Sequence, residues 1–401
     1  MIFIVESSTV PIYNRIALAF INTLRVLGHT VHYINPIDFT DESFINTINN
    51  IEIDFYISTN ELNKIQHKSQ NNEYFIFEKI NARKIYIHHD NLFSGINELS
   101  KISQKISAFI NSKKNSFHFC LEKSNVGLLK NVGILNAFHL FHASEFNNLN
   151  LPSNFQCGVS FVGHLMSSLK SYPTECLAAG EHLRTLALNR FSSSRYAIQP
   201  QLDRISSDLY IFPNSDENQD INIYSAAKKQ FLIANINKLS SAIRGDYIRF
   251  IKNQRVDIFG GDLSYGTIKD PLLKIDQENI YYNPATSDYQ FTSNIYKNTR
   301  INLNFTALQF DTAMNNRCVD VINSGGFLIT DAMSDFLESD ELAREISFDS
   351  PEEMLYKINY YSYNDSRYKE VKEAIQINFS ENYNYINQVQ KILTEISNSK
   401  F

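Results

Sequence analysis

The chain has 401 residues, of which 43% are hydrophobic, and its formal net charge is −6 at pH 7. At about 150 residues per domain this length predicts two or three domains, and the apolar content excludes an intrinsically disordered chain. The acidic balance gives no general electrostatic attraction to nucleic acid, so we expect no nucleic-acid partner.

The sequence also bears on the compartment. No apolar run approaches the roughly 18 residues of a membrane span, and residues 1–6 lack the positive segment of a signal peptide. The four cysteines form no C-x-x-C pair, which disfavours a zinc ribbon or a redox motif. We therefore expect a cytoplasmic protein with reduced thiols and no membrane span, for which peripheral membrane association stays open.

The first half of the chain alternates apolar runs with amphipathic segments, which is typical of a parallel α/β sheet. Residues 1–7 predict a strand. Apolar residues then recur at helical spacing from Ile12, and Gly28 is a natural helix stop. Further strands are predicted at 30–35, 54–59, 84–88, 117–121 and 135–142.

Polar residues follow several of these strands at their carboxyl ends. They are Glu6, Ser7, His88, His89, Asp90 and Glu122. The carboxyl edge of an open parallel sheet is where ligands bind, so we expect a site along this edge.

The second half repeats the α/β pattern after a polar stretch at 142–156 that contains Pro152. Strands are predicted at 159–162, 255–259, 280–282, 301–305 and 327–330, and helices at 174–189, 221–251 and 351–398. The predicted fold is therefore α/β, with two Rossmann-like domains facing a cleft. We place them at 1–150 and 151–385, with a helical insertion at about 165–250 and a terminal helix at 386–401 packing back on the first domain.

Several motifs are absent, and their absence narrows the chemistry. The chain has no G-x-G-x-x-G, no P-loop, no G-x-S-x-G and no Asp-x-Asp. Support for hydride-transfer cofactors, P-loop ATPases and α/β-hydrolases is thereby lost. His29/His32 and His139/His142 lack zinc-site spacing, so we expect no metal site.

The most informative stretch is 295–335. It resembles the C-terminal module of GT-B-fold glycosyltransferases, in particular the CgeB-like (spore maturation) group. The matching residues are Tyr296, Arg300, Asn302, Asn304, Asn315, Arg317, Asp320, Gly325, Gly326, Thr330 and Asp331, with the 161–164 and 259–261 turns as further matches. The resemblance is clearest over roughly 155–398.

The resemblance implies a glycosyltransferase in which 151–385 binds a nucleotide-sugar donor and 1–150 binds a glycan, lipid-linked or protein acceptor. The donor is a substrate, so no cofactor is expected. The residues implied to bind it are Gly163, His164, Gly260, Gly261, Asn304, Asn316, Arg317, Asp320, Gly325 and Gly326. Surface polysaccharide or glycoconjugate synthesis in a bacterium is the expected setting.

Physical chemistry is consistent with these assignments. Arg317 and Asp320 lie three apart on a helix and share a face, where an Arg can pair with a diphosphate and an acid can accept ribose hydroxyls. The 324–326 turn lets the backbone approach a ligand closely. The alternatives are a surface ion pair without a ligand and, for His164, an ordinary surface histidine.

One departure concerns the paired acids, separated by seven residues, that many retaining GT-B enzymes carry here. Asp320 fills the second position, whereas the first falls at Thr312, with Asp311 beside it. The pattern leaves open whether the donor configuration is retained or inverted.

His88, His89 and Asp90 are the candidates for proton chemistry in the first domain, where a histidine could deprotonate an acceptor hydroxyl. The alternative is a simple turn in which Asp90 caps the next segment. Two rival functions also stay open: a nucleotide-sugar 2-epimerase on the same fold, and a non-catalytic GT-B-like binding module.

Overall fold

The computed structural model describes residues 1–8, 11–34, 46, 48–59, 80–90, 92, 98–147, 155–165, 169–170, 172–207, 221–260, 275, 277–284 and 288–399. The chain forms two compact units. Unit 1 comprises 1–141, 215–230 and 385–401, and unit 2 comprises 142–214 and 231–384.

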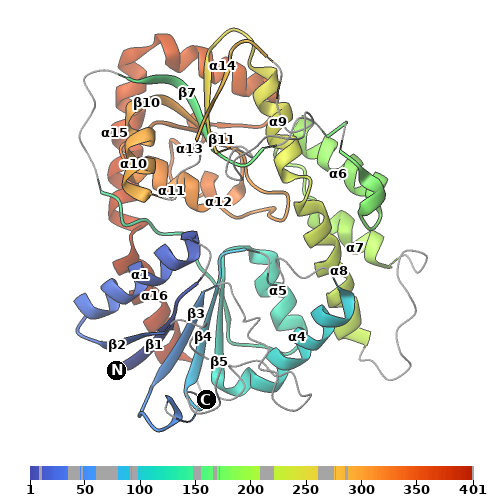
Figure 1. The fold of residues 1–401 in the computed structure, drawn as a ribbon, viewed down its shortest axis with the longest axis vertical. Coiled ribbons are helices and arrows are strands. Elements are labelled where there is room, and N and C mark those ends of the chain that lie inside the picture. The colour runs from blue at the N-terminus through green and yellow to red at the C-terminus, as the bar shows by residue number, and fades with distance from the viewer. Residues whose placement is uncertain are drawn as a thin grey trace. The chain divides into compact units, whose positions relative to one another are not determined.

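Unit 1 is a parallel sheet with helices (Figure 1). Its elements are β1 (Ile2–Glu6), α1 (Pro11–Val26), β2 (Thr30–Ile34), β3 (Phe55–Thr59), β4 (Arg83–His88), α4 (Leu99–Ser112), the 3-10 turn η2 (Lys113–Asn115), β5 (Ser116–Cys120), α5 (Lys123–Asn131), β6 (Ala137–His139) and α16 (Tyr385–Asn398). The six described strands lie in the order β2-β1-β3-β4-β5-β6.

The spacing of apolar residues explains how α1 packs. Ile16, Phe20 and Leu24 are all buried, as their helical spacing predicts. The helix ends before Gly28, whose φ of 83° suits glycine. On the same helix, the Phe20 ring meets the Tyr385 ring of α16 edge to face at 5.5 Å. The C-terminal helix therefore belongs to the core of unit 1.

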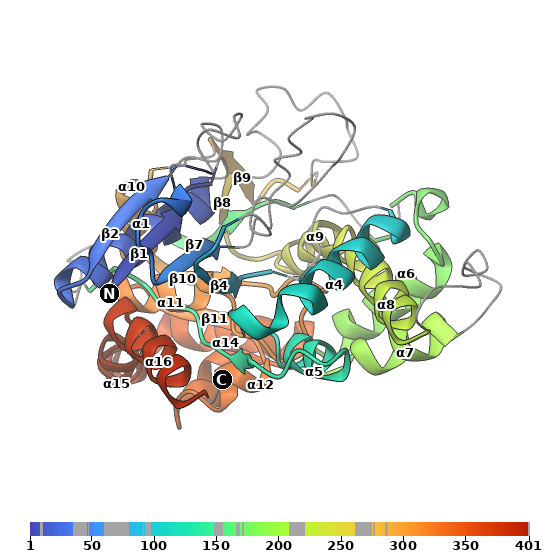
Figure 2. The same ribbon diagram turned by 90° about the horizontal axis from the view of Figure 1, so that it is seen from below.

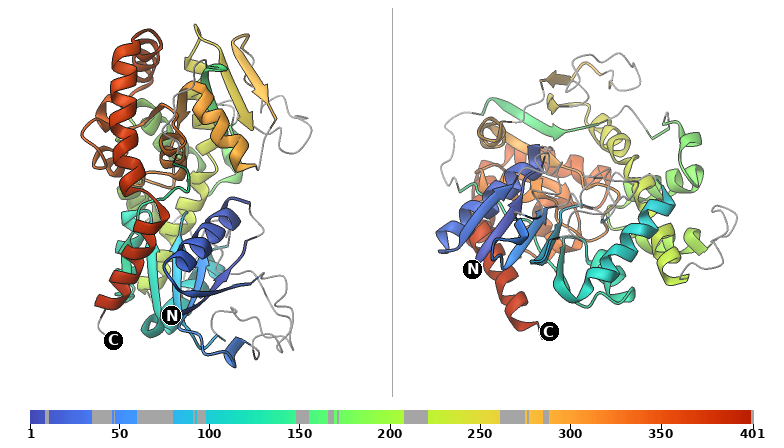
Figure 3. Two further views of the ribbon diagram at one scale, coloured as in Figure 1. Left: turned by 90° about the vertical axis from the view of Figure 1, so that its left-hand side faces the viewer. Right: turned by 60° about the horizontal axis from the view of Figure 1, so that its bottom comes forward.

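Unit 2 is a second parallel sheet, of which β8 and β9 form one edge (Figure 3). Its elements are β7 (Cys157–Gly163), the 3-10 turn η3 (Thr174–Cys176), α6 (Gly180–Ser192), α7 (Gln199–Ser207), α8 (Ile221–Asn237, shared with unit 1), α9 (Ser240–Phe250), β8 (Val256–Gly260), β9 (Ile280–Asn283), α10 (Tyr289–Asn298), β10 (Thr299–Asn304), α11 (Asn316–Asn323), β11 (Leu328–Asp331), α12 (Ser334–Leu337), α13 (Ala343–Ile346), β12 (Ser347–Phe348), α14 (Pro351–Tyr363) and α15 (Asp365–Asn382). The described strands lie in the order β12-β11-β10-β7-β8-β9.

The predicted α/β fold is confirmed, and the differences are local. The helix predicted from residue 174 begins only at Gly180, after the 3-10 turn η3, and glycine is needed at 180 because a Cβ there would collide with the Thr174 carbonyl. The helix predicted at 221–251 is two helices, α8 and α9. The helix predicted at 351–398 is interrupted at Asn364, which caps α15. β12 has only two residues, too short to leave a pattern.

The Gly325-Gly326 turn needs glycine because of its backbone conformation and the close approach of the protein's own chain. Gly325 has a φ of 82°, and a Cβ on Gly326 would lie 2.7 Å from the Tyr296 carbonyl oxygen and 2.9 Å from Asn302 Nδ2. The turn precedes β11, so it lies at the amino edge of the sheet, opposite the edge where Gly163 ends β7. This corrects the ligand contact predicted for the two glycines, because the close approach is made by the protein's own chain.

Replacing Gly326 by alanine should therefore destabilise the protein by about 1–3 kcal/mol through overpacking. Gly158→Ala is the matched control, because a Cβ on Gly158 would have no neighbouring atom within 4 Å. Urea unfolding followed by circular dichroism measures both. Equal stabilities for the two variants would contradict this account of the turn.

Candidate functional site

Gly163 and Gly260, which we call the glycine floor, leave the backbone uncovered at the carboxyl edge of the unit 2 sheet. β7 ends at Gly163 and β8 at Gly260, and the two residues pair across the strands. Their φ values are 148° and 113°, and a Cβ on Gly260 would lie 3.1 Å from the Gly163 carbonyl oxygen. Side chains are excluded here, so a ligand can reach the backbone. Gly261, the other predicted residue of this turn, lies outside the described residues.

Asn304 organises the middle of this edge. It is fully buried at the end of β10. Its Nδ2 donates to Thr330 Oγ1 at 2.8 Å, and its Oδ1 accepts from Arg317 Nη1 at 2.7 Å and from Asn315 Nδ2 at 2.9 Å. One amide thereby joins β10, β11 and the start of α11.

Arg317 is held in a defined orientation over the glycine floor. Its guanidinium carbon lies 5.0 Å from the centre of the Phe161 ring, a cation–π contact. A Cβ on Gly163 would come within 2.7 Å of Nη2, so a larger residue at 163 would displace the guanidinium from this position. Since Arg317 is half-buried rather than enclosed, its charge is available at this edge.

The first turn of α11 adds a second source of positive potential. Asn315 caps the helix by accepting from the Cys318 N–H at 3.3 Å, and Asn316, half-exposed, is the first helical residue. The amino end of a helix carries partial positive charge and free N–H groups. With Arg317 and the glycine floor, it makes a site suited to a phosphate or diphosphate group.

Arg244 is a second cation at this edge and was not among the residues predicted from the sequence. It comes from α9, and it donates from Nη1 to the His164 carbonyl oxygen at 3.4 Å and from Nε to the Phe305 carbonyl oxygen at 3.3 Å. His164 itself is exposed. In sequence, Arg244 is one arginine in a long helical stretch, with no local signal to distinguish it.

Asp331 holds the backbone that leaves β10. Its buried carboxylate accepts from the Thr306 N–H at 3.1 and 3.0 Å and from the Thr306 hydroxyl at 2.9 Å. Burial raises the pKa of Asp331, against the lowering effect of these hydrogen bonds. The Thr-Asp pair of the sequence motif therefore has a structural role.

Asp320 and Arg317 point to different partners although they are three residues apart. Asp320 is 4% exposed, and Ser144 Oγ donates to its Oδ1 at 2.7 Å. Ser144 also forms a β-bridge with Asn384. Asp320 therefore lies near the first and the last residues of unit 2, 142 and 384. A carboxylate can accept further hydrogen bonds, so the Ser144 contact is compatible with a second, ligand-directed one.

Asp311 takes part in a buried ion pair with Arg190 of α6. It also accepts from the backbone N–H groups of Ile198 and Gln199 at 2.9 and 2.6 Å. Its neighbour Thr312 accepts, through its carbonyl oxygen, from the Asp335 N–H at 3.0 Å. The acid beside the first position of the paired-acid motif is thus used within the protein.

In unit 1, His88 belongs to the layer between the sheet and α4. Its Nε2 lies 3.1 Å from His118 Nδ1, with the two rings stacked at 5.4 Å, and Phe109 of α4 meets both rings edge to face. Burial lowers the pKa of His88 well below its usual value and that of His118 to about 3. This environment is that of a packing residue, and it argues against a catalytic role for His88.

His89 and Asp90 follow at the carboxyl end of β4. His89 is 5% exposed, and burial lowers its pKa to about 3, which makes it a weak base near neutral pH. Asp90 is half-buried and accepts a hydrogen bond from the Tyr13 hydroxyl of α1. Asp90 is therefore the better placed of the two for proton transfer.

The other polar residues of this edge have structural partners. Glu6 is buried and accepts from the Tyr56 hydroxyl at 2.7 Å. Glu122 is the N-cap of α5, where its side chain accepts from the Ser124 N–H at 3.5 Å. Neither contact excludes a further role, but each explains the residue without a ligand.

Two features are absent from the described part of the chain. No group of three or more His, Cys, Asp or Glu side chains among the described residues could hold a metal ion. Nor does any helix in the described ranges have the length and apolar character to cross a membrane.

Known proteins resemble this chain in part of its sequence and in its fold. Residues 242–394 match the family described as glycosyl transferase-like. No curated protein sequence matches the chain. In fold, the chain is similar to T4 phage BGT in complex with UDP-glucose (10% identity, TM-score 0.52), with 99% of this chain and 98% of that chain covered.

Two further structures have the same fold. The Anabaena protein HepE in complex with UDP and glucose is 10% identical with a TM-score of 0.51, over 99% of both chains. An alpha-glucosyltransferase in complex with UDP-glucose and DNA containing an abasic site is 9% identical with a TM-score of 0.54, again over 99% of both chains. The two-domain α/β fold of the chain is thus that of the GT-B glycosyltransferases.

The buried histidines predict acid sensitivity. The unfolded chain binds protons at His88, His89 and His118 below about pH 6.5, whereas the folded protein does so only at far lower pH. The free energy of unfolding should therefore fall as the pH drops from 6.5 towards 4, by up to about 1.4 kcal/mol per pH unit for each histidine.

Urea unfolding between pH 4 and pH 7 tests this expectation. His118→Gln should reduce the slope by about one proton, whereas His32→Gln, at an exposed residue of β2, should leave it unchanged. Equal slopes in wild type and His118→Gln would show that His118 is not held neutral in the folded state.

Proposed function

We propose that the protein is a glycosyltransferase that moves a sugar from a nucleotide-activated donor to an acceptor. The observation that supports it most is the placement of Arg317 and Asn304 beside the bare backbone of Gly163, within a GT-B fold. The segment that matches the glycosyl transferase-like family contains two of these three residues. We further assign the chain to the CgeB-like group, acting in bacterial surface polysaccharide or glycoconjugate synthesis.

The donor proposed is a nucleoside diphosphate sugar, with a hexosyl group on UDP as the first choice. The fold neighbours carry UDP-glucose or UDP in their complexes, which supports this choice. The diphosphate would lie over Gly163 and Gly260, where Arg317, Arg244 and the amino end of α11 supply positive charge. Asp320 would accept from a ribose hydroxyl.

The chemistry asked of unit 2 is stabilisation of the leaving group. When the glycosidic bond breaks, negative charge develops on the released diphosphate, and fixed cations at that position lower the barrier. Arg317 is suited to this because Asn304 and Phe161 fix its orientation before the donor arrives. We propose that this stabilisation needs no metal ion.

Unit 1 would bind the acceptor, with Asp90 as the general base. Removing a proton from the acceptor hydroxyl raises its nucleophilicity, and the carboxylate fixed by Tyr13 is placed at the sheet edge where ligands bind. We propose a glycan, lipid-linked or protein acceptor in the cytoplasm. The net charge of −6 gives no support to nucleic acid as the acceptor.

Release of UDP from UDP-glucose, with and without candidate acceptors, tests the function. Release that depends on an acceptor supports a transferase. Interconversion of the nucleotide sugar without an acceptor would identify a 2-epimerase instead, and binding without turnover would identify a binding module.

The donor site gives the next prediction. Arg317→Ala should weaken UDP-glucose binding at least tenfold, because losing a charge-assisted hydrogen bond costs about 1.5–3 kcal/mol. Asp320→Asn should weaken it in the same direction while keeping the size of the side chain. Titration calorimetry measures both.

Arg255→Ala is the matched control for the donor site. Arg255 precedes β8 at the amino edge of the same sheet, and its side chain is 60% exposed. The variant should bind UDP-glucose as the wild type does. Wild-type affinity in both Arg317→Ala and Asp320→Asn would remove the donor assignment.

The acceptor site gives a separate prediction. Asp90→Asn should lower turnover by about 10² to 10⁴ with little effect on donor affinity, since a general base acts only in the chemical step. His89→Gln should have a smaller effect, because burial already makes His89 a weak base. Glu98→Gln, at an exposed carboxylate of unit 1, is the control. Greater sensitivity at His89 than at Asp90 would reverse the assignment.

A further inference from the structure

The loop at 305–315 connects the end of β10 to the N-cap of α11. It therefore determines where Asn315 and Arg317 lie at the carboxyl edge of the sheet. The loop has no regular secondary structure of its own, so contacts from other elements must fix its backbone.

Helix α6 supplies the first of these contacts through Arg190, which is 4% exposed. Its Nη1 donates to the Phe310 carbonyl oxygen at 3.2 Å, and its Nη2 pairs with the Asp311 carboxylate. Its Nε donates to the Tyr196 carbonyl oxygen at 2.6 Å, which ties the same guanidinium to the chain between α6 and α7.

Helix α7 is held to the loop from the other side. The Asp311 carboxylate accepts from the N–H groups of Ile198 and Gln199, where α7 begins. The Gln199 side chain returns a hydrogen bond from Nε2 to the Gln309 carbonyl oxygen at 3.1 Å. The 305–315 loop and the start of α7 therefore provide hydrogen-bond partners for each other.

Helix α9 completes the support, and it lies against α6 (Figure 2). Ser240 Oγ accepts from the Leu308 N–H at 2.9 Å, and Arg244 donates to the Phe305 carbonyl oxygen. Helices from one stretch of sequence, 180–250, thus contact the loop at residues along most of its length.

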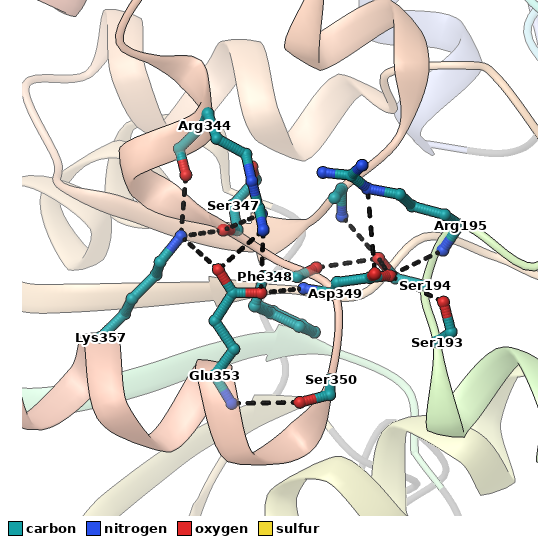
Figure 4. Close-up of polar contacts among 11 residues, drawn as sticks. Ser193, Ser194, Arg195, Arg344, Ser347, Phe348, Asp349, Ser350, Glu353 and Lys357 are labelled. Carbon is teal, nitrogen blue, oxygen red and sulfur yellow. Dashed lines mark hydrogen bonds and ion pairs between the residues drawn. The ribbon is translucent and has the colours of Figure 1, made fainter.

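The same stretch is anchored to the sheet at 193–195, as Figure 4 shows. The Asp349 carboxylate accepts from Ser193 Oγ at 2.8 Å and from the Arg195 N–H at 3.1 Å. Ser194 Oγ donates to the Phe348 carbonyl oxygen of β12 at 2.8 Å. The connection between α6 and α7 is therefore fixed relative to the strands.

We propose that α6, α7 and α9 form a positioning element for the diphosphate subsite, and that the buried Arg190–Asp311 pair sets the conformation of the 305–315 loop. The proposal rests on the proposed function for its ligand, a nucleoside diphosphate sugar. Arg190 and Asp311 are positioning residues, because they act on the ligand through Asn315 and Arg317.

The test must separate a lost position from a lost fold. Removing one member of a buried ion pair leaves the other charge uncompensated, so a single variant is expected to fold poorly. The double variant Arg190→Met/Asp311→Asn removes both charges at similar volume. Arg255→Met/Asp257→Asn is the matched control, because it removes an ion pair at the opposite edge of the sheet.

Three measurements are made on each double variant: the free energy of unfolding, the affinity for UDP-glucose by calorimetry, and hydrogen exchange at the 305–315 amides without nucleotide. The Arg190/Asp311 double variant should fold, lose exchange protection in the loop, and bind UDP-glucose at least tenfold more weakly. The control should keep the wild-type exchange protection in the loop and the wild-type affinity for UDP-glucose.

Unchanged loop protection, or wild-type affinity in a folded Arg190/Asp311 variant, would overturn the proposal. Failure of the wild type to bind any nucleotide sugar would overturn the proposed function and with it the ligand. Hydrogen exchange would then still decide whether the pair holds the loop, so the two failures are distinguishable.

Discussion

The hydrogen bonds of one buried amide, Asn304, connect the parts on which the candidate donor site depends. Its Nδ2 is used by β11, and its Oδ1 by both Asn315 and Arg317. An amide offers donors and acceptors on opposite sides, so no aliphatic or acidic side chain of this size can replace it. Removing this amide would take a hydrogen bond from the half-buried Arg317 guanidinium, whereas the Thr330 hydroxyl would keep its contact with Asp331. The position of the cation therefore follows from its hydrogen bond to this buried amide.

The two sheets use their carboxyl edges differently. In unit 2 the edge combines glycine backbone with cations whose orientation is fixed. In unit 1 several polar residues of the edge contact other parts of the protein: His88 stacks with His118, and Glu6 accepts a hydrogen bond from Tyr56. Polar character at a strand end therefore identifies an edge, but only the contacts of each side chain separate a ligand-facing group from a buried one.

Much of the fold could be predicted from the sequence because its signals are local. Apolar residues fill most of β1 and β8, and helical spacing marks α1, since each element buries its face within a few residues of chain. The break between η3 and α6 could not, because it goes with a close approach of Gly180 to the Thr174 carbonyl oxygen that no apolar pattern encodes. The hydrophobic pattern also left the break between α8 and α9 unmarked. The same holds for β12, whose two residues depend on contacts with distant parts of the chain, pairing with β11 and accepting a hydrogen bond from Ser194.

The residues of the candidate site were harder to predict from the sequence than the elements of the fold. Gly163 and Arg317 are separated by more than 150 positions, and a family resemblance was needed to name them together. Arg244 and the Arg190–Asp311 pair carry no such motif, so only the folded chain reveals them.

Helical spacing also gives an incomplete account of Arg317 and Asp320. They share a face of α11, yet one reaches Asn304 and the other Ser144, because a helix face spans two neighbours at once. For the donor proposed above, this division would put phosphate at the amino end of the helix and ribose one turn further. The Ser144 hydroxyl holds the Asp320 side chain in place without a ligand, since it donates to Oδ1 at 2.7 Å. The candidate site is in this sense preorganised: the protein's own polar groups orient Arg317 and Asp320, so the proposed donor would bind with little reorganisation.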